Sequence, residues 1–513
     1  MAIRWNEGAI VDVAARPRFH RETTPIWLTA ACTFLGCRAP DLTQPFRYAD
    51  LGCGTGLDAI IVAATCPRAD VWGFDFNPMN IEAARDLATR AGLTNIRFEE
   101  LPFSALAGSE LPQFDFMVVE AVLGVISPRN QAHVLATIER NLRPGGLAYL
   151  GYQTDTGWTE FEPIQTLMRI LTEQGIDASE FAVPRNFDFL DRLKSGGAMY
   201  FVRNPVLEQK LAEIRRRPEA DVALQFLNRD WRALMFADVA DAMAEVKCEF
   251  LGRATLHENI ASSSVPPAML PLLEAAQSVR IRETMQDIAT GTGYRRDIYR
   301  RGLAFQTVTE HRARIGAMTV VAISDGELTL PTWQGPVPAD PALYQPLAWA
   351  LRDGPLSVDA ARTLGPLAGE PIEAAADALA MLIASGRAHP VMPDPVAQEA
   401  SAQVSRLNDA IIDAVTRGED LGYLVSPLIG SAVEANPLEI LTAGALLRSG
   451  SPNDLDGLTG DVTAAMVLGG RSVTRGGVPV EDGDEARTIL REIVARIVEH
   501  RVPWFRRLRV LQT

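Results

Sequence analysis

The sequence is poor in the features that membrane proteins and zinc proteins need. None of its 513 residues lies in a run near the roughly 18 apolar residues of a membrane helix, and the N-terminus has no apolar segment of signal-peptide type. The five cysteines form no CxxC pair and the six histidines are scattered, which argues against a structural zinc site. We therefore expect a cytoplasmic protein with reduced cysteines, no metal and no membrane insertion.

Positive charge is also scarce. The chain has 49 lysines and arginines against 64 aspartates and glutamates, for a net charge of −15. Nucleic-acid binders usually carry a basic surface, so we expect no nucleic-acid partner. An acidic surface instead keeps the chain soluble and mildly favours a cationic substrate. Apolar residues make up 47 % of the chain, enough for packed cores in the two to four domains that this length allows.

A glycine-rich turn lies within residues 47–60, which read RYADLGCGTGLDAI. An apolar run precedes the glycines and apolar residues at helical spacing follow them. The glycines therefore occupy a strand-to-helix turn, where a ligand meets bare backbone and a helix N-terminus. The dinucleotide fingerprint would need glycine where Leu57 stands, and the Walker loop needs a lysine that this turn lacks. With Asp50 at the strand end, the turn suits a ligand with an ammonium group and an adenosine but no phosphate.

The next strand and helix supply a second half for such a site. The stretch ADVWGFDFNP predicts a strand that ends in Asp75, whose carboxylate can accept hydrogen bonds from ribose hydroxyls. Phe76 can lie against an adenine, and Asn77 and Pro78 begin a helix. Three further strands alternate with helices, at NIRFEELPF, FDFMVVEAV and LAYLGYQ. This alternation predicts a parallel, doubly wound sheet.

Residues 48 to 151 resemble the core of a class I S-adenosylmethionine-dependent methyltransferase. The matching stretches are DLGCGTG, FDFNP, FDFMVV and LRPGGLAYL, in that order. The resemblance implies S-adenosyl-L-methionine as the cofactor, with its methionine part on Asp50 and the glycines, its ribose on Asp75, and its adenine on Phe76 and Phe103. The adenine amine would contact backbone near Pro102, where many relatives have an acid. The implied cofactor-binding residues are Asp50, Gly52, Cys53, Gly54, Gly56, Asp75, Phe76, Asn77, Pro102, Phe103 and Glu120.

A wider resemblance, on the residues around RETTPIWL, GW, LMFADVADAMAEVKCEFLGRATLHENI and RRDIYRRG, extends over roughly residues 15 to 305. These stretches are similar to bacterial methyltransferases that carry a methyltransferase regulatory domain. That family includes rickettsial enzymes that methylate lysines of outer-membrane proteins. The resemblance implies a protein-lysine N-methyltransferase with a protein substrate.

The acceptor side departs from the pattern of that family. EAVLGV follows the fourth strand in place of His-Gly-Val/Ile-Tyr-Ser-Trp, and GYQTDTGW follows the fifth, with Gln153 and Thr156 in place of Asn and Pro. Our candidate catalytic residues are Glu120 and Tyr152, because both end strands at the carboxyl edge, where open α/β sheets bind ligands. A surface or ion-paired acid remains an alternative for Glu120, and core packing remains one for Tyr152. His20 and Arg21, which precede the domain, are candidates to close over the cofactor, and ordinary surface contacts are the alternative for both.

Composition and periodicity divide the rest of the chain. We expect the cofactor-binding core at 1–158, a helical insertion at 159–230, the end of the core sheet with a regulatory region at 231–329, a winged-helix-like domain at 330–400 and a helical region at 401–513. The winged-helix-like segment has no arginine or lysine between Glu370 and Ser385. Because DNA contact needs such cations, we expect this segment to meet a protein surface instead.

The expected fold is therefore α/β, with a seven-stranded, doubly wound, Rossmann-like core, a helical insertion and a mainly α, winged-helix-like C-terminal region. The predicted activity is protein-lysine N-methylation by direct in-line methyl transfer, with a homodimer among the expected assemblies. Two alternatives stay open. One is a small-molecule methyltransferase, and the other is a non-catalytic protein that senses the cofactor or binds a partner.

Overall fold

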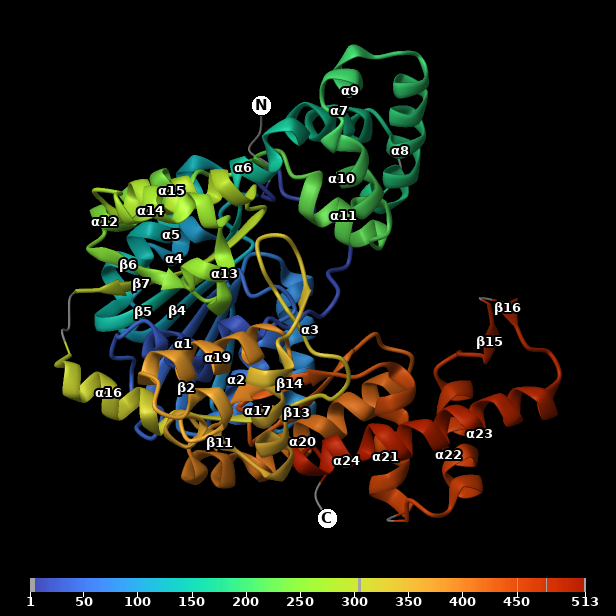
Figure 1. The fold of residues 1–513 in the computed structure, drawn as a ribbon. Helices are drawn as coiled ribbons and strands as arrows, with labels where there is room; N and C mark the ends of the chain where they lie inside the picture. Colours follow the sequence, from blue (N-terminus) through green and yellow to red (C-terminus); the bar gives the residue numbers. More distant parts are fainter. Residues whose placement is uncertain (1–4, 177, 303–305, 450, 477, 512–513) are drawn as a thin grey trace.

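The computed structural model describes residues 5–176, 178–302, 306–449, 451–476 and 478–511 of the chain. Its centre is a seven-stranded sheet of order β3-β2-β1-β4-β5-β7-β6, in which β7 runs antiparallel to both neighbours (Figure 1). This topology confirms the predicted doubly wound core. The strands are β1 (Phe46–Leu51), β2 (Ala69–Asp75), β3 (Ile96–Glu100), β4 (Phe114–Glu120), β5 (Leu142–Gln153), β6 (Cys248–Arg253) and β7 (Tyr294–Arg301).

Both faces of the sheet are covered, because successive side chains of each strand point to opposite sides. Tyr48 and Val118 belong to one apolar cluster with the α1–α3 side, whereas Leu51 and Val119 belong to another with α5 and α12. Two-sided burial explains why the central strands read as near-continuous apolar runs. The covering helices are α1 (Pro25–Phe34), α2 (Leu57–Thr65), α3 (Pro78–Arg90), α4 (Phe103–Leu106), α5 (Pro128–Asn141) and α12 (Phe236–Glu245).

A helical unit stands apart from the sheet, at the upper right of Figure 1. Its apolar core includes Phe161, Phe226 and Trp231, which with Trp158 form an aromatic cluster with ring centroids 5.1–6.4 Å apart. The two tryptophans lie where the chain leaves and re-enters the core, so this cluster anchors the unit. Its elements are α6 (Asp155–Trp158), η2 (Thr159–Phe161), α7 (Glu162–Glu173), α8 (Ser179–Ser195), α9 (Met199–Arg203), α10 (Val206–Arg215) and α11 (Glu219–Phe226).

The C-terminal region is mainly helical, as predicted, and shares one continuous apolar core with the α1–α3 side of the sheet. Its three-stranded sheet has the order β11-β8-β12 and includes a strand at residues 319–322, before the expected domain start at 330. The elements here are α16 (Val308–Ala317), β8 (Thr319–Ala322), β9 (Thr329–Leu330), β10 (Val337–Pro338), α17 (Pro341–Asp353), β11 (Leu356–Ser357), α18 (Val358–Ala361), η5 (Gly365–Leu367), α19 (Ile372–Ala384) and β12 (Ala388–Pro390).

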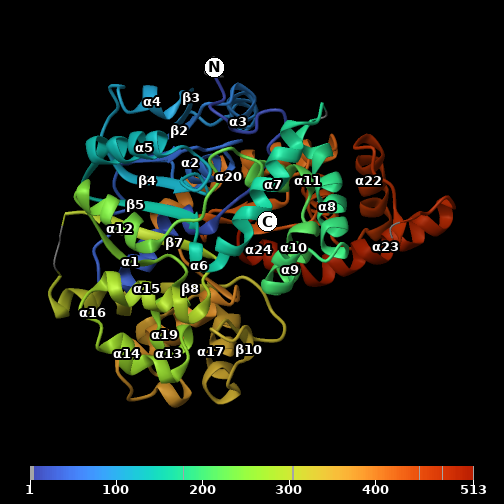
Figure 2. The ribbon, with the colours of Figure 1, turned by 90° about the horizontal axis from the view of Figure 1, so that it is seen from above.

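The last part of the chain forms a hairpin and a helical end, in which α22 and α23 extend away from the rest of the molecule (Figures 1 and 2). None of the described helices combines the length and apolar character that crossing a bilayer requires. The elements are α20 (Asp394–Thr416), β13 (Tyr423–Ser426), β14 (Ser431–Glu434), α21 (Pro437–Ser449), α22 (Leu455–Leu468), β15 (Thr474–Arg475), β16 (Val478–Pro479), α23 (Gly483–His500) and α24 (Val502–Arg507).

The region between the helical unit and β7 is held by a buried arginine cluster. Arg295 donates to Asp287 at 2.8 Å, to Glu283 at 3.0 Å and to Asp297 at 2.9 Å, and Arg253 donates to Asp287 at 2.9 Å. The helix α15 therefore packs on β6 and β7 through its charged face. The elements of this region are η3 (Leu256–Asn259), α13 (Ala261–Ser264), η4 (Pro267–Met269), α14 (Leu270–Glu274) and α15 (Val279–Thr290).

We expect the Arg295→Leu variant to lose about 3–5 kcal/mol of unfolding free energy, because three buried carboxylates would lose their shared cation. Chemical denaturation followed by circular dichroism measures the loss. Arg280→Leu is the control, since Arg280 and its partner Asp241 are both more than half exposed and should cost less than about 1 kcal/mol. Equal losses in the two variants would contradict a stabilising role for the cluster.

Candidate functional site

The glycine turn joins β1 to α2 with all three glycines in left-handed backbone conformations, at φ +86° for Gly52, +54° for Gly54 and +75° for Gly56. A Cβ on Gly52 would lie 2.5 Å from Val122, and one on Gly56 would lie 2.6 Å from Phe98. Around Gly54, in contrast, no described atom lies within 4 Å of such a Cβ. The outer two glycines therefore allow close packing, and the middle one leaves bare backbone open to a ligand.

Asp75 ties the second strand to this turn. Its carboxylate accepts a hydrogen bond from the Gly54 N–H at 3.0 Å and another from the Asn77 N–H at 2.8 Å. Burial raises the pKa of Asp75, and these hydrogen bonds oppose that rise. Asn77 caps α3 by accepting from the Met79 N–H at 3.0 Å, as its place before Pro78 predicts. The carboxylate that we expect to hold the ribose is thus already oriented by backbone amides.

Two aromatic residues predicted to contact the adenine border the turn. Phe103 begins α4, and its ring lies 3.7 Å from the Cβ position of Gly52, while Pro102 precedes that helix as its N-cap residue. Phe76 packs against Trp5, with ring centroids 5.9 Å apart. The thiol of Cys53 has a pKa raised well above its usual value, first by burial, so it stays protonated. None of the sequence motifs that predicted the cofactor site includes Trp5.

Negative charge gathers at this edge of the sheet. Asp50 is only 3 % exposed, and none of the described residues donates a hydrogen bond to its side chain. Burial raises the pKa of Asp50 well above its usual range, and the neighbouring carboxylates Asp58, Asp75 and Glu120 raise it further. A ligand with an ammonium and a sulfonium group would relieve this repulsion. The open backbone at Gly54, the oriented Asp75 and the unbonded Asp50 therefore fit S-adenosylmethionine.

Glu120 ends β4 in a tightly built polar site. Its two carboxylate oxygens accept hydrogen bonds from the hydroxyls of Tyr149 and Tyr294, each at 2.7 Å. Burial first, and then the charge of Glu120, raise the pKa of both tyrosines well above the usual value, so both remain donors. The next residue, Ala121, has φ +56°, a strained conformation that is concentrated at functional sites.

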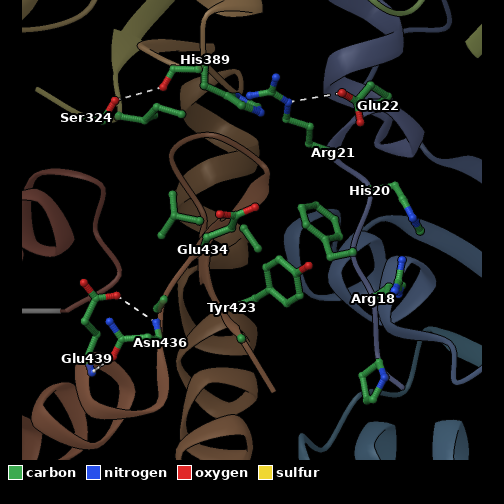
Figure 3. Close-up of a pocket in the computed structure, with 18 of the residues that line it drawn as sticks. Arg18, His20, Arg21, Glu22, Ser324, His389, Tyr423, Glu434, Asn436 and Glu439 are labelled. Atoms are coloured by element: carbon green, nitrogen blue, oxygen red, sulfur yellow. Dashed lines mark hydrogen bonds and ion pairs between the residues drawn. The ribbon is translucent and has the colours of Figure 1, made fainter. Parts of the chain in front are cut away.

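The N-terminal segment reaches this site through His20. Its Nδ1 lies 2.9 Å from Asp58, and its Nε2 lies 3.9 Å from Glu120. Burial alone would lower the pKa of His20, but Asp58, Glu120 and Glu22 outweigh it and raise the pKa to about 9. Arg21 points elsewhere, toward Glu22 at 3.4 Å (Figure 3). Its guanidinium group also lies over the ring of Trp27. Of the two residues expected to close over the cofactor, only His20 therefore contacts the site's carboxylates.

The structure does not bring Tyr152 into this site. The side chain is 1 % exposed, and its hydroxyl donates to Asp297 at 2.6 Å within the buried arginine cluster. The reason is strand alternation, because Gly151 pairs with Glu120 across the two strands and Tyr152 points to the opposite face. Tyr149 lies on the same face of β5 as Gly151, so the hydroxyl of Tyr149, and not that of Tyr152, reaches Glu120.

Comparisons with known proteins agree with this geometry. A family model described as a methyltransferase domain matches residues 43–167, and one described as a predicted methyltransferase regulatory domain matches residues 219–301. The chain is an S-adenosylmethionine-dependent methyltransferase with a regulatory domain. The fold of this methyltransferase is similar to that of PKMT2 from Rickettsia typhi in complex with AdoHcy, with a TM-score of 0.69, 16 % identity and coverage of 97 % of this chain and 99 % of the other.

Curated relatives of the methyltransferase fall into two groups. An uncharacterized protein of Synechocystis is 29 % identical over 440 residues, which are 85 % of this chain and 87 % of the relative. A trans-aconitate 2-methyltransferase of Methylobacterium radiotolerans is 27 % identical over 205 residues, which are 40 % of this chain and 67 % of that enzyme. The second match spans less than half of this chain, so it bears on the methyl-transfer core and not on the C-terminal region.

We expect the Asp75→Ala variant to bind S-adenosylmethionine roughly 10- to 150-fold more weakly, since hydrogen bonds to a charged group are worth about 1.5–3 kcal/mol. Isothermal titration calorimetry measures the change. Asp70→Ala is the matched control, because Asp70 lies at the other end of β2 and pairs with Arg47 and Arg97. Affinity within threefold of the wild type, in a variant that unfolds at the same temperature, would remove Asp75 from the site.

We also expect the His20→Gln variant to lose stability in a pH-dependent way. A histidine pKa raised from 6.5 to about 9 stabilises the fold fully below pH 6.5, and this contribution is lost as the pH rises through 9. Because the side chain keeps 29 % exposure, screening limits the loss to about 1–2 kcal/mol at pH 6. Denaturant titrations from pH 6 to pH 10 test this, with the exposed His500→Gln as control. A deficit that is equal at both ends would disprove the assignment.

Proposed function

We propose that this methyltransferase acts on the ε-amino groups of lysine side chains in a protein substrate. The observation that carries the proposal is the Glu120 carboxylate, held by two buried tyrosine hydroxyls at the cofactor edge of the sheet. A methyl-accepting amine reaches the enzyme as a cation, and carboxylates with aromatic side chains attract cations. S-adenosylmethionine, when bound, supplies a methyl group on a positively charged sulfur.

The proton of the lysine ammonium has to leave before the nitrogen can attack, and Glu120 is the residue that we assign to bind the cation and accept this proton. Its side chain is 9 % exposed, so an amine beside it would be partly desolvated, which lowers the pKa of a lysine. Tyr149 and Tyr294 hold both carboxylate oxygens in place. Protonated His20, 3.9 Å away, places a positive charge beside this carboxylate.

A cavity of about 1070 Å³ lies next to this site and is large enough for a polypeptide segment (Figure 3). His20 lines this cavity and also lies beside Glu120, so the cavity is one side chain away from the proposed proton acceptor. Most of the charged groups on its wall are already paired, as in Arg16 with Asp420 and Arg18 with Asp221. The acceptor would therefore be held by shape and backbone contacts more than by its own charges.

Two backbone segments border the cavity, the N-terminal residues 16–22 and residues 432–436 at the end of β14 and just after it. The Ala435 N–H donates to the Gly422 carbonyl. Because inward and outward backbone groups alternate along an antiparallel strand, the N–H and C=O groups of Ala432 and Glu434 point away from β13. Arg501 donates a hydrogen bond to the Glu434 carbonyl. The backbone N–H and C=O of Ala432 have no hydrogen-bond partner among the described residues. A polypeptide acceptor can add to this edge as a further strand.

Within this proposal the C-terminal region shapes the acceptor site and does not bind DNA. The helix α19, which the winged-helix pattern would use for recognition, buries nine of its thirteen residues inside the protein. The neighbouring Ser324, Gly386 and His389 line the cavity. We therefore propose that the segment from 330 onward is a structural and acceptor-binding part of the enzyme.

The alternative acceptor is a small molecule. The match to trans-aconitate 2-methyltransferases favours it for the cofactor-binding core. A small carboxylic-acid substrate would have to approach Asp50, Asp58 and Glu120 against charge repulsion, whereas a lysine would not. This electrostatic difference favours the amine.

We expect the Glu120→Gln variant to lose about 100-fold in kcat/KM while it binds the cofactor within threefold of wild type, because general-base contributions are of this size. Methyl transfer from labelled cofactor to protein in a bacterial lysate is the assay, and acid hydrolysis identifies N-methyllysine. Glu82→Gln, an exposed change on α3, is the control and should keep full activity.

Two results would contradict the proposal. Label that enters only the small-molecule fraction would favour the alternative acceptor. Full activity of Glu120→Gln on protein would show that Glu120 takes no part in catalysis. The lysine assignment would then depend only on whether acid hydrolysis releases N-methyllysine.

A further inference from the structure

A second cavity, of about 1420 Å³, lies at the amino edge of the sheet, opposite to the edge that binds the cofactor. Its core-side wall includes Phe46 at the start of β1, Asp115 near the start of β4, and Arg143 to Gly145 near the start of β5. Since β7 runs antiparallel to these strands, its last residues, Arg300 and Arg301, reach the same edge. The C-terminal region closes the other side with residues around Met318, Met392 and Leu428.

The charge of this cavity is opposite to that of the whole chain. Its lining contains six arginines and three aspartates, with no lysine or glutamate, so the local formal charge is +3 in a chain of −15. The arginines are Arg38, Arg143, Arg300, Arg301, Arg314 and Arg509, and the aspartates are Asp41, Asp115 and Asp394. The sheet therefore separates carboxylates at its cofactor edge from guanidinium groups at its other edge.

Two of the three aspartates are already used by the protein. Asp115 pairs with Arg143 and accepts a hydrogen bond from the Arg47 N–H at 2.8 Å. Asp41 accepts from the backbone and hydroxyl of Thr43 at 2.9 and 2.7 Å. These bonds hold the two carboxylates on the wall.

Three of the arginines have their guanidinium groups available. Arg38, Arg314 and Arg509 are exposed, and within the described ranges their side chains form no ion pair or hydrogen bond. The hydrogen bonds from Thr43 lower the pKa of Asp41, and the charges of Arg314 and Arg38 lower it further. The two arginines therefore lie near the same carboxylate. Arg509 is held in a left-handed conformation at φ +57°.

Apolar side chains form the floor beneath this rim. Ile26, Leu42, Phe46, Met392 and Leu428 line the cavity and are each at most 5 % exposed. Guanidinium groups bind carboxylates and phosphates through paired hydrogen bonds, and an apolar floor favours a ligand with a carbon framework. A bare inorganic ion would use only the rim.

We propose that this arginine-lined cavity binds a small organic anion, with phosphate or carboxylate groups on the arginine rim and an apolar or aromatic body on the floor. The site is distinct from the cofactor site, whose carboxylates select a cation. Because Arg38 belongs to the core and Arg314 and Arg509 to the C-terminal region, the ligand joins the two parts of the chain. The inference does not depend on which acceptor the enzyme methylates.

Fluorescence titration with 1-anilinonaphthalene-8-sulfonate, an aromatic anion, tests the proposal on the full-length protein. We expect saturable binding that weakens as salt rises, because the contacts with the rim are ionic. Adenosine monophosphate and citrate serve as competitors, and the one that displaces the probe identifies the anionic group as phosphate or carboxylate. Saturating S-adenosylmethionine should not displace it.

The decisive comparison uses two triple variants with the same change in net charge. Arg38→Gln/Arg314→Gln/Arg509→Gln should lower the affinity for the probe by roughly tenfold or more. Arg312→Gln/Arg496→Gln/Arg506→Gln, at exposed positions outside the cavity, should stay within about twofold. Equal affinity in the two variants, displacement by S-adenosylmethionine, or no saturable binding would each overturn the proposal.

Discussion

Mutual repulsion among carboxylates at one edge of a buried sheet is the constraint on which the functional part of this protein depends. Asp50 and Asp75 are each at most 8 % exposed and lie in one electrostatic neighbourhood with Asp58 and Glu120. Such a group is stable only if each member has a compensating partner. Asp75 has backbone amides, Glu120 has two tyrosines, and Asp58 has His20. Asp50 has no such partner among the described residues, so a cationic ligand would compensate it.

The N-terminal segment supplies one of these compensating charges, His20, and also connects separate parts of the molecule. Its alternate residues pair with charged groups from four places, Arg16 with Asp420, Arg18 with Asp221, His20 with Asp58, and Glu22 with Arg296. Phe19 adds an edge contact to Tyr423 at 5.7 Å. One short segment therefore joins the core, the helical unit and the C-terminal hairpin. The cavity of about 1070 Å³ lies along this segment, so a movement of the segment would change both the cavity and the position of His20.

The acceptor side shows how a methyl-transfer core is adapted without a change of fold. The carboxyl edge of the sheet keeps the cofactor turn, while the residues after β4 and β5 differ from the pattern that the family resemblance predicts. Aromatic character is nonetheless present beside Glu120, because Tyr149 comes from the interior of β5 and Tyr294 is the first residue of β7. The regulatory domain therefore contributes to the site directly, since β7 belongs to the stretch that its family model matches.

Local patterns in the sequence were enough to predict the glycine turn, the carboxylates beside it and the seven-stranded sheet. The glycine turn, Asp75 at a strand end and Asn77 as a helix cap depend on residues within a few positions of one another, and hydrophobic alternation is likewise local. The acceptor half depended on tertiary structure. The hydroxyls on Glu120 come from residues 29 and 174 positions away. Whether Tyr149 or Tyr152 reaches Glu120 depends on which face of the sheet each strand residue takes, and Tyr152 takes the core-packing alternative. Strand register and the path of the N-terminal segment, which place Tyr149 and His20, result from long-range packing that no short stretch of sequence encodes.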